Sequence, residues 1–84
     1  MSADLKVYLD VLEERDREGR IFPRSFVWED GTRYEIDKVL QICRAASLRA
    51  GGAGLRYTVK INGRERYMFL EDDERARWFM ERRD

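Results

Sequence analysis

Residues Leu55–Leu70 read LRYTVKINGRERYMFL, and this stretch decides the fold class. Two runs of β-forming residues flank the dipeptide Asn62-Gly63. An Asn-Gly pair readily adopts the positive φ values of a tight type I′ turn, so the stretch predicts a β-hairpin with a two-residue turn.

The length of this turn determines which side chains share a face of the hairpin. With a two-residue turn, Tyr57 lies opposite Met68 and Thr58 lies opposite Tyr67. The expected apolar face holds Leu55, Tyr57, Val59, Ile61, Met68 and Leu70, and the expected opposite face holds Arg56, Lys60, Tyr67 and Phe69. A three-residue loop is the alternative, and it would exchange the faces of the side chains at positions 67–70.

The N-terminal residues 5–12, LKVYLDVL, alternate between apolar and other side chains, which predicts a half-buried strand. A helix over residues 3–18 is the competing interpretation, but the apolar residues recur at every second position rather than at helical spacing. The charged residues 13–19 that follow are expected to form a loop, in which Gly19 can adopt a positive φ.

A second two-residue turn signal, Asp30-Gly31, lies within the β-like residues 26–36. If these two residues form the turn, Trp28 lies opposite Arg33, and the guanidinium group can lie over the indole ring. Pro23 precedes this hairpin and cannot donate a backbone hydrogen bond, so it is expected at the start of a strand or on a sheet edge.

The remaining elements are read from shorter patterns. The alternation slips by one near residues 37–38, which indicates a bulge or a bend in a long strand. A short helix over 37–48 is the alternative, because its residues are fair helix formers. Residues 47–54 are expected as a glycine-rich loop, and residues 76–82 as a closing strand or, alternatively, a short helix.

The chain is therefore expected to form a single small β domain over residues 1–84. Five to six strands joined by hairpin turns are typical of a small SH3-like barrel or a rolled antiparallel sheet, with room for one short helical turn. The chain contains no apolar run long enough to span a membrane and no signal-peptide pattern, so a cytoplasmic location is expected.

The composition argues against an enzyme. The chain has no histidine and a single cysteine, Cys43, which removes the commonest general base and any conventional zinc site. Cys43 lies in an apolar run and is interpreted as a small core residue in a reducing compartment. The acidic run 71–74 lacks the glycine of a calcium loop and is expected to be a solvated turn. We therefore expect no catalytic residue, no metal site and no cofactor.

Charge is abundant but balanced, with 17 basic and 17 acidic residues. Most of the basic residues are arginines, whose planar guanidinium group suits either surface ion-pair networks or contacts with anions. The balance favours ion-pair networks over a surface dedicated to a polyanion.

The first candidate surface is an aromatic patch that would bind a protein partner or a second copy of the chain. A domain of 84 residues cannot bury all of its large aromatic side chains, and those left at the surface mark interfaces. The residues expected in this patch are Phe26, Trp28, Arg33 and Trp78.

The second candidate is weak nucleic-acid binding through the basic-aromatic hairpin region 49–69. Residues 49–67 carry five basic side chains and one acidic side chain. Such residues can follow phosphates while an aromatic ring stacks on a base. The residues expected to contribute are Arg49, Arg56, Lys60, Arg64, Arg66 and Tyr67. The balanced overall charge favours the protein partner over nucleic acid.

Two phrases of the chain resemble a group of small, uncharacterised bacterial proteins of similar length. These are WEDGTRYEIDKVL at residues 28–40 and RAGGAGLRYTV at residues 49–59, and the resemblance extends over residues 6–82. It implies a compact, mainly β fold in a cytosolic bacterial protein. It implies no activity, cofactor or functional residue.

Overall fold

The computed structural model describes residues 5–46 and 53–82, which form seven β-strands and no helix. The strands are β1 (Lys6–Arg15), β2 (Ile21–Val27), β3 (Arg33–Glu35), β4 (Lys38–Ala46), β5 (Ala53–Ile61), β6 (Arg64–Glu71) and β7 (Trp78–Glu81). The predicted β fold class is confirmed, with more strands than the five to six expected and no helical turn in these two ranges. No helix in the described part of the chain is long and apolar enough to cross a membrane.

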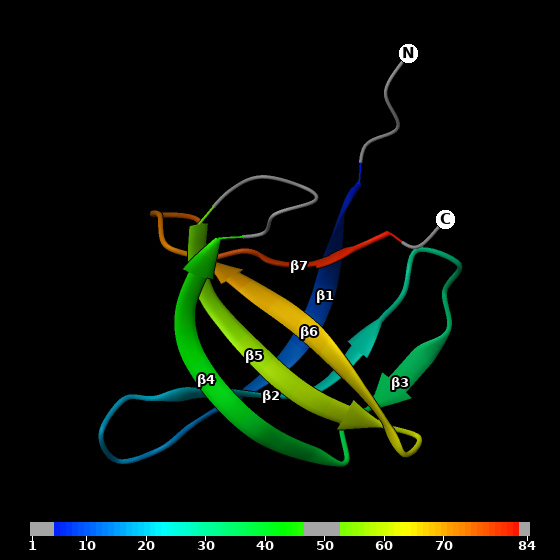
Figure 1. Cartoon of the computed structure of the whole chain (residues 1–84), viewed down its shortest axis with the longest axis horizontal. Helices are drawn as coiled ribbons and strands as arrows, with labels where there is room; N and C mark the ends of the chain where they lie inside the picture. The colour runs from blue at the N-terminus through cyan, green and yellow to red at the C-terminus, as the bar shows by residue number, and fades with distance from the viewer. Residues whose placement is uncertain (1–4, 47–52, 83–84) are drawn as a thin grey trace.

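All seven strands belong to one antiparallel sheet with the order β3-β2-β1-β7-β6-β5-β4 (Figure 1). The sheet curls into a half-barrel, and its edge strands β3 and β4 are consecutive in the chain. The backbone N–H of Ile36 donates to the Arg24 carbonyl at 2.9 Å, and that of Asp37 donates to the Lys60 carbonyl at 2.8 Å. The short link between the edge strands is thus bonded to β2 and to β5, which brings the two edges together at this corner.

The predicted hairpin of β5 and β6 is confirmed. Asn62 and Gly63 have φ values of 50° and 78°, as a two-residue turn of the primed type requires. Tyr57 is paired with Met68, which is the register expected from the sequence. The hairpin therefore directs one apolar row of side chains toward the inside of the half-barrel.

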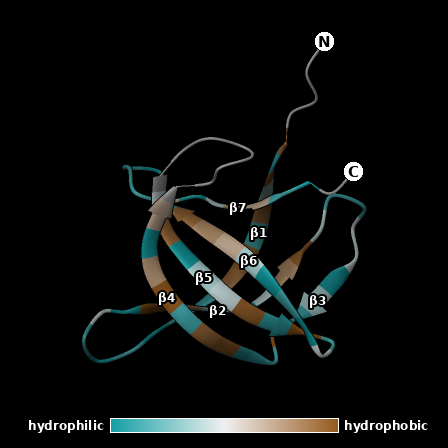
Figure 2. Ribbon diagram, viewed as in Figure 1, coloured by the Kyte–Doolittle hydropathy of each residue, from teal (hydrophilic) through white to brown (hydrophobic). Residues whose placement is uncertain are grey.

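The core lies on the concave face, where buried side chains from β1, β2, β5, β6 and β7 pack together. Its members are Val7, Leu9, Phe26, Tyr57, Val59, Ile61, Met68, Leu70, Trp78 and Met80. The Tyr57 hydroxyl donates to the Ile21 carbonyl at 2.6 Å, and the Trp78 Nε1–H donates to a Glu13 carboxylate oxygen at 2.6 Å. These bonds satisfy the polar atoms of the two largest core side chains. Figure 2 shows hydrophobic and hydrophilic residues alternating along much of the sheet.

Strand β1 changes its partner part of the way along. Residues Lys6–Leu9 pair with β7, and residues Asp10–Arg15 pair with β2. The register of the β1–β2 pair shifts beside Pro23, where β2 contains one extra residue. Pro23 lies in the part of β2 that has β1 as its only strand partner in the described chain, so the missing N–H of proline breaks no ladder bond. The predicted edge position of Pro23 is confirmed.

The hairpin at Asp30-Gly31 differs from the prediction. The N–H of Trp28 donates to the Thr32 carbonyl at 2.8 Å, which leaves a loop of three residues, 29–31. Gly31 has a φ of 87°, the left-handed conformation that commonly completes a three-residue loop. Trp28 therefore lies across from Thr32, and the predicted pairing of Trp28 with Arg33 is wrong.

Two boundaries of the predicted strands also change. β1 continues through Arg15, because residues 13–15 pair with β2 where the sequence predicts a loop. The long strand that was expected to bend near 37–38 is two strands, and the β4 bulge lies between Val39 and Gln41. Charged side chains do not prevent a strand when one face of it is open to water.

Three other predictions are resolved by the strands. The closing strand near the C-terminus is confirmed at Trp78–Glu81. Gly54, expected in the loop 47–54, belongs to β5, and most of that loop lies outside the described residues. Cys43, expected in the core, is half-buried opposite Arg56 and belongs to the convex face, so its prediction as a core residue is wrong.

Replacing Gly54 by alanine should destabilise the protein severely. A Cβ atom at this position would lie 2.1 Å from the Leu70 carbonyl oxygen and 3.0 Å from the Asp72 nitrogen, both of them backbone atoms. We expect a loss of about 2–4 kcal/mol in the free energy of unfolding, because β5 and β6 must separate to admit the methyl group. Urea unfolding followed by tryptophan fluorescence measures this loss.

Gly19→Ala is the matched control for that substitution. Gly19 has a φ of 84° and open space around it, so an added Cβ meets no neighbour. The cost there should be only about 1 kcal/mol, from the left-handed backbone alone. Equal losses in the two variants would contradict the close contact of β5 with β6 at Gly54.

Stability should fall at alkaline pH through Tyr57. Burial raises the pKa of this phenol above its usual value, and the nearby Glu13 carboxylate raises the pKa further. The folded state therefore favours the neutral phenol, so its contribution is fully present below about pH 10 and is lost as the pH rises through the folded pKa. Tyr57→Phe should lower the free energy of unfolding by about 1 kcal/mol at neutral pH, because the Ile21 carbonyl loses its donor. Above about pH 10 the variant should lose less stability than the wild type, because it has no phenol to ionise.

The measurement is the free energy of unfolding in urea as a function of pH. Tyr67→Phe serves as the control, because this tyrosine is exposed on the convex face. If Tyr57→Phe and the wild type lose stability equally above about pH 10, another group is responsible for the alkaline instability.

Candidate functional site

The sheet is incompletely paired where β6 meets β7. The described ladder between these strands contains only two pairs, Phe69 with Phe79 and Leu70 with Trp78. β7 then continues alongside β1, while the first half of β6 has β5 as its only described partner. Figure 1 shows β6 and β7 diverging from their connection, and Figure 2 shows that the diverging half of β6 is its hydrophilic half.

A groove lies at this divergence, on the concave face of the half-barrel. Its volume is about 620 Å³, and it is lined by residues from β2, β3, β5, β6 and β7 and from their connections. The apolar part of its wall consists of Phe26, Trp28, Tyr34, Ile61 and Met80. The polar part consists of Glu29, Asn62, Arg64, Arg66, Glu81 and Arg82.

The aromatic side chains of the groove are held by the core beneath them. Phe26 and Tyr34 are cross-strand partners, and their rings stack with centroids 5.4 Å apart and planes inclined by 25°. Trp28 is half-buried and packs against the core cluster. Rigid aromatic surface of this kind needs little ordering when a ligand covers it.

The groove carries charge of both signs, with an excess of arginine. Arg82 forms an ion pair with Glu29, which joins the end of β7 to the β2–β3 loop. Arg64 is exposed, and its side chain has no ion pair or hydrogen bond within the two described ranges. Arg64 lies opposite Ile61 and Arg66 lies opposite Val59, so both arginines project on the concave face.

The predicted aromatic patch is only partly assembled. Phe26 and Trp28 line the groove together, as a shared patch requires. Trp78 is 4% exposed and belongs to the core, because its indole ring packs against Tyr57 at 4.8 Å. Arg33 turns away from Trp28 and donates to Glu35 at 3.2 Å and to the Ser25 hydroxyl at 3.0 Å. Trp78 and Arg33 therefore do not line this groove, although Trp78 and Trp28 both border a second hollow beside β1.

The predicted basic cluster is divided between the two faces of the sheet. Arg56, Lys60 and Tyr67 belong to the convex face, whereas Arg64 and Arg66 belong to the concave face. Arg49 lies outside the described residues. The hairpin register already implies this division, because Arg64 and Arg66 fall opposite core residues while Lys60 falls opposite Glu65. The described members of the predicted cluster therefore do not form one continuous surface.

The convex face carries a second, smaller cluster of rings. Phe69 and Phe79 stack with centroids 5.0 Å apart, and they are 4% and 1% exposed. The Lys6 ammonium lies 4.6 Å from the centre of the Phe79 ring. The Arg56 guanidinium lies 4.4 Å from the centre of the Tyr67 ring. Cations therefore lie on the faces of these rings and take part in sealing the cluster from water.

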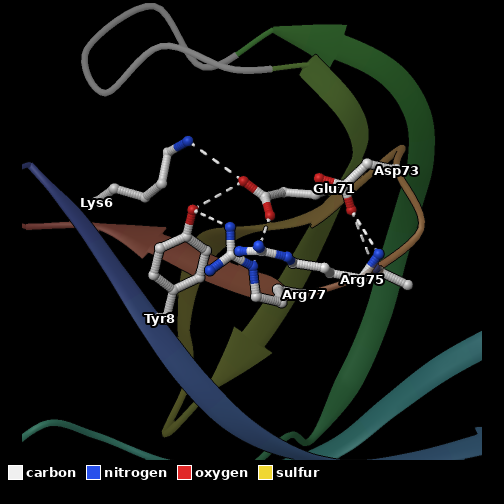
Figure 3. Close-up of polar contacts among 7 residues, drawn as sticks. Lys6, Tyr8, Glu71, Asp73, Arg75 and Arg77 are labelled. Atoms are coloured by element: carbon white, nitrogen blue, oxygen red, sulfur yellow. Dashed lines mark hydrogen bonds and ion pairs between the residues drawn. The ribbon is translucent and has the colours of Figure 1, made fainter.

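The Glu71 carboxylate, at the end of β6, joins β1 to the connection that precedes β7, at the margin of this cluster (Figure 3). Its side chain is 10% exposed and accepts from Lys6 Nζ at 3.3 Å, from the Tyr8 hydroxyl at 2.9 Å and from Arg77 Nε at 3.2 Å. The Arg77 guanidinium also lies 4.0 Å from the centre of the Tyr8 ring. Three donors satisfy this carboxylate, so the network holds strands together and leaves the carboxylate no unpaired oxygen to offer a ligand.

The acidic run 71–74 is therefore not uniform. Its first residue, Glu71, belongs to the network, and only the remainder matches the predicted solvated turn. Asp73 accepts at 3.0 Å from each of the N–H groups of Arg75 and Ala76, which orders the connection between β6 and β7 (Figure 3). Within residues 5–46 and 53–82 no group of acidic or cysteine side chains has the arrangement of a metal site.

Comparison with protein-family models, with curated proteins and with solved structures finds no match to this chain. The wall of the groove combines apolar rings with arginines, and the described part of it contains no nucleophile beside a base. Apolar rings edged by a few polar groups are a common arrangement in binding sites.

Replacing Glu71 by glutamine should destabilise the protein without altering the groove. The substitution removes the charge that Lys6 and Arg77 share, at a site where water is largely excluded. We expect a loss of about 1–2 kcal/mol in the free energy of unfolding, measured by urea titration. Asp72→Asn is the control, because the ion pair of Asp72 with Arg44 is exposed and should contribute less than about 1 kcal/mol. Similar losses in both variants would show that burial of Glu71 is unimportant.

Proposed function

We propose that this protein is a small non-enzymatic interaction module, and that its concave groove binds a segment of a partner protein. The proposal rests on one observation, which is the exposed groove whose wall joins Phe26, Trp28 and Tyr34 to the apolar side chains of Ile61 and Met80. Water-exposed apolar hollows with a few polar groups around them are the usual form of a binding site.

Three properties of the groove support a protein partner. The volume of about 620 Å³ lies within the range of ligand-binding clefts. Trp28 is half-buried, so its indole is fixed by packing yet still reachable. Tryptophan, tyrosine and arginine are the residues that most often dominate binding energy at protein interfaces, and all three types line this groove.

Nucleic acid is less well supported. Its binding depends on a continuous basic surface, because counterion release supplies most of the affinity. The basic side chains of the β5–β6 hairpin lie on two opposite faces, and the whole chain has a formal net charge of zero. A partner that combines apolar side chains with a few carboxylates fits the groove better than a polyphosphate.

Selection from a displayed library of random short peptides tests the proposal. We expect the full-length protein to enrich peptides whose synthetic forms bind with micromolar affinity, and Trp28→Ala to weaken that binding at least about tenfold. Isothermal titration calorimetry measures the affinity, and circular dichroism confirms that the variant folds. Leu12→Ala is the control, because it removes an exposed apolar side chain from β1, outside the groove.

Two outcomes would overturn the proposal. The first is the absence of any peptide whose binding depends on Trp28. The second is binding of a single-stranded oligonucleotide that depends on Arg56 and Tyr67 and fades as salt rises, with no peptide bound. That result would place the function on the convex face instead.

A further inference from the structure

We propose that the partner segment binds as an added β-strand along the free side of β6, at residues 64–68, and that this segment is acidic. The inference rests on the proposed function, since it states how the groove would hold its partner. It adds a binding mode, main-chain strand addition, and a chemical class of partner.

The first half of β6 has backbone hydrogen-bonding groups that point away from β5 and could pair with an added strand. Ile61 and Arg64 close a two-residue turn, so they form a pair that exchanges both of its hydrogen bonds. Because hydrogen-bonded and non-hydrogen-bonded pairs alternate along an antiparallel ladder, Glu65 and Tyr67 direct their N–H and C=O groups away from β5. No strand in the described part of the chain pairs with them on that side, because the ladder to β7 begins at Phe69.

The groove lies beside this free side of β6. Arg64 and Arg66 form one wall of it, and Met80 and Arg82, from the end of the chain that diverges from β6, line it from across the gap. A strand placed between them would direct alternate side chains to the concave face, where Trp28 lies, and to the convex face, where Tyr67 lies. Strand addition therefore uses the unpaired backbone and the aromatic wall at the same time.

The charge of the groove selects the partner. Arg64 and Arg66 are two positions apart on one face of β6, so their Cα atoms are separated by about 6.6 Å along the strand. Alternate residues of an added strand have the same spacing, so two carboxylates at every second position can each meet an arginine. Arg82 adds a third positive charge and is paired with Glu29, and Glu81 is the other carboxylate of the wall, so arginines outnumber acidic residues by three to two. A basic segment would instead meet like charges at the two β6 positions.

The charges on this part of β6 also bear on which strands can pair with it. Charged side chains on a free strand edge suppress pairing with other chains, and the exposed half of β6 carries Arg64, Glu65 and Arg66. These charges reject apolar and basic strands. They leave the edge open to a segment whose carboxylates match the concave-face arginines.

NMR titration of the full-length protein with a short synthetic peptide of alternating glutamate and valine tests the inference. We expect amide shifts confined to β6 and the groove, and slower hydrogen exchange at the Glu65 and Tyr67 amides. The peptide of alternating lysine and valine should leave these signals unchanged. Every second amide of the peptide can be N-methylated in either of two registers. Methyl groups on the edge that faces β6 should abolish binding, whereas methyl groups on the opposite edge should preserve it.

Charge reversal provides the second arm of the experiment. Arg64→Glu should weaken binding of the glutamate-valine peptide about tenfold, since an attraction is replaced by a repulsion of similar size. Lys38→Glu makes the same change of charge on an exposed residue of β4, paired with Lys60 on the convex face, and should leave the affinity unchanged. Equal effects of the two variants would overturn the acidic specificity.

The outcomes separate this inference from the proposed function. If displayed peptides bind in a Trp28-dependent way but leave the Glu65 and Tyr67 amides unprotected, strand addition is wrong and the groove remains a binding site. If both N-methylated registers bind equally well, strand addition is also overturned. If no peptide binds at the groove, the proposed function itself fails.

Discussion

The two-residue turn at Asn62-Gly63 is the constraint on which the rest of the structure depends. Its positive φ values fix the register of β5 against β6, and a shift of one residue would turn every side chain of one strand to the other face. The apolar row of both strands then builds the core. The same register sends Arg64 and Arg66 to the concave face, where they border the groove, and leaves Arg56 on the convex face beside the ring of Tyr67.

Many charged side chains of the described residues form ion pairs within the protein itself. Ion pairs between described residues connect Lys6 and Arg77 with Glu71, Arg20 with Asp16 and Glu18, Arg24 with Glu14, Arg33 with Glu35, Arg44 with Asp72, and Arg82 with Glu29. Most of these pairs are exposed, so each contributes little, and the Glu71 network is the partly buried exception. This matches the expectation that an arginine-rich chain of balanced charge forms surface networks. Arg64 takes part in none of these ion pairs, and it is one of the polar residues that line the groove.

The sequence predicted the hairpins and the closing strand better than the contacts between distant segments. Alternation over residues 5–12 identified β1, and its true end at Arg15 depends on pairing with β2, which local pattern does not report. Gly31 was assigned to a two-residue turn, but a left-handed glycine also completes a three-residue loop, and this one-residue difference separates Trp28 from Arg33. Of the aromatic residues proposed for a surface patch, Phe26 and Trp28 do meet in one groove.

By itself, the sequence determined the local geometry of this protein: the Asn-Gly turn, the faces of β5 and β6, and the mainly β class. These follow from short-range sterics and from side-chain alternation, which the order of residues contains directly. Only the tertiary structure decided that Trp78 is buried and that β6 and β7 part after two residue pairs. That divergence arises because β7 follows β1 while β6 follows β5. The groove is a consequence of how distant strands share partners, and no local pattern encodes it.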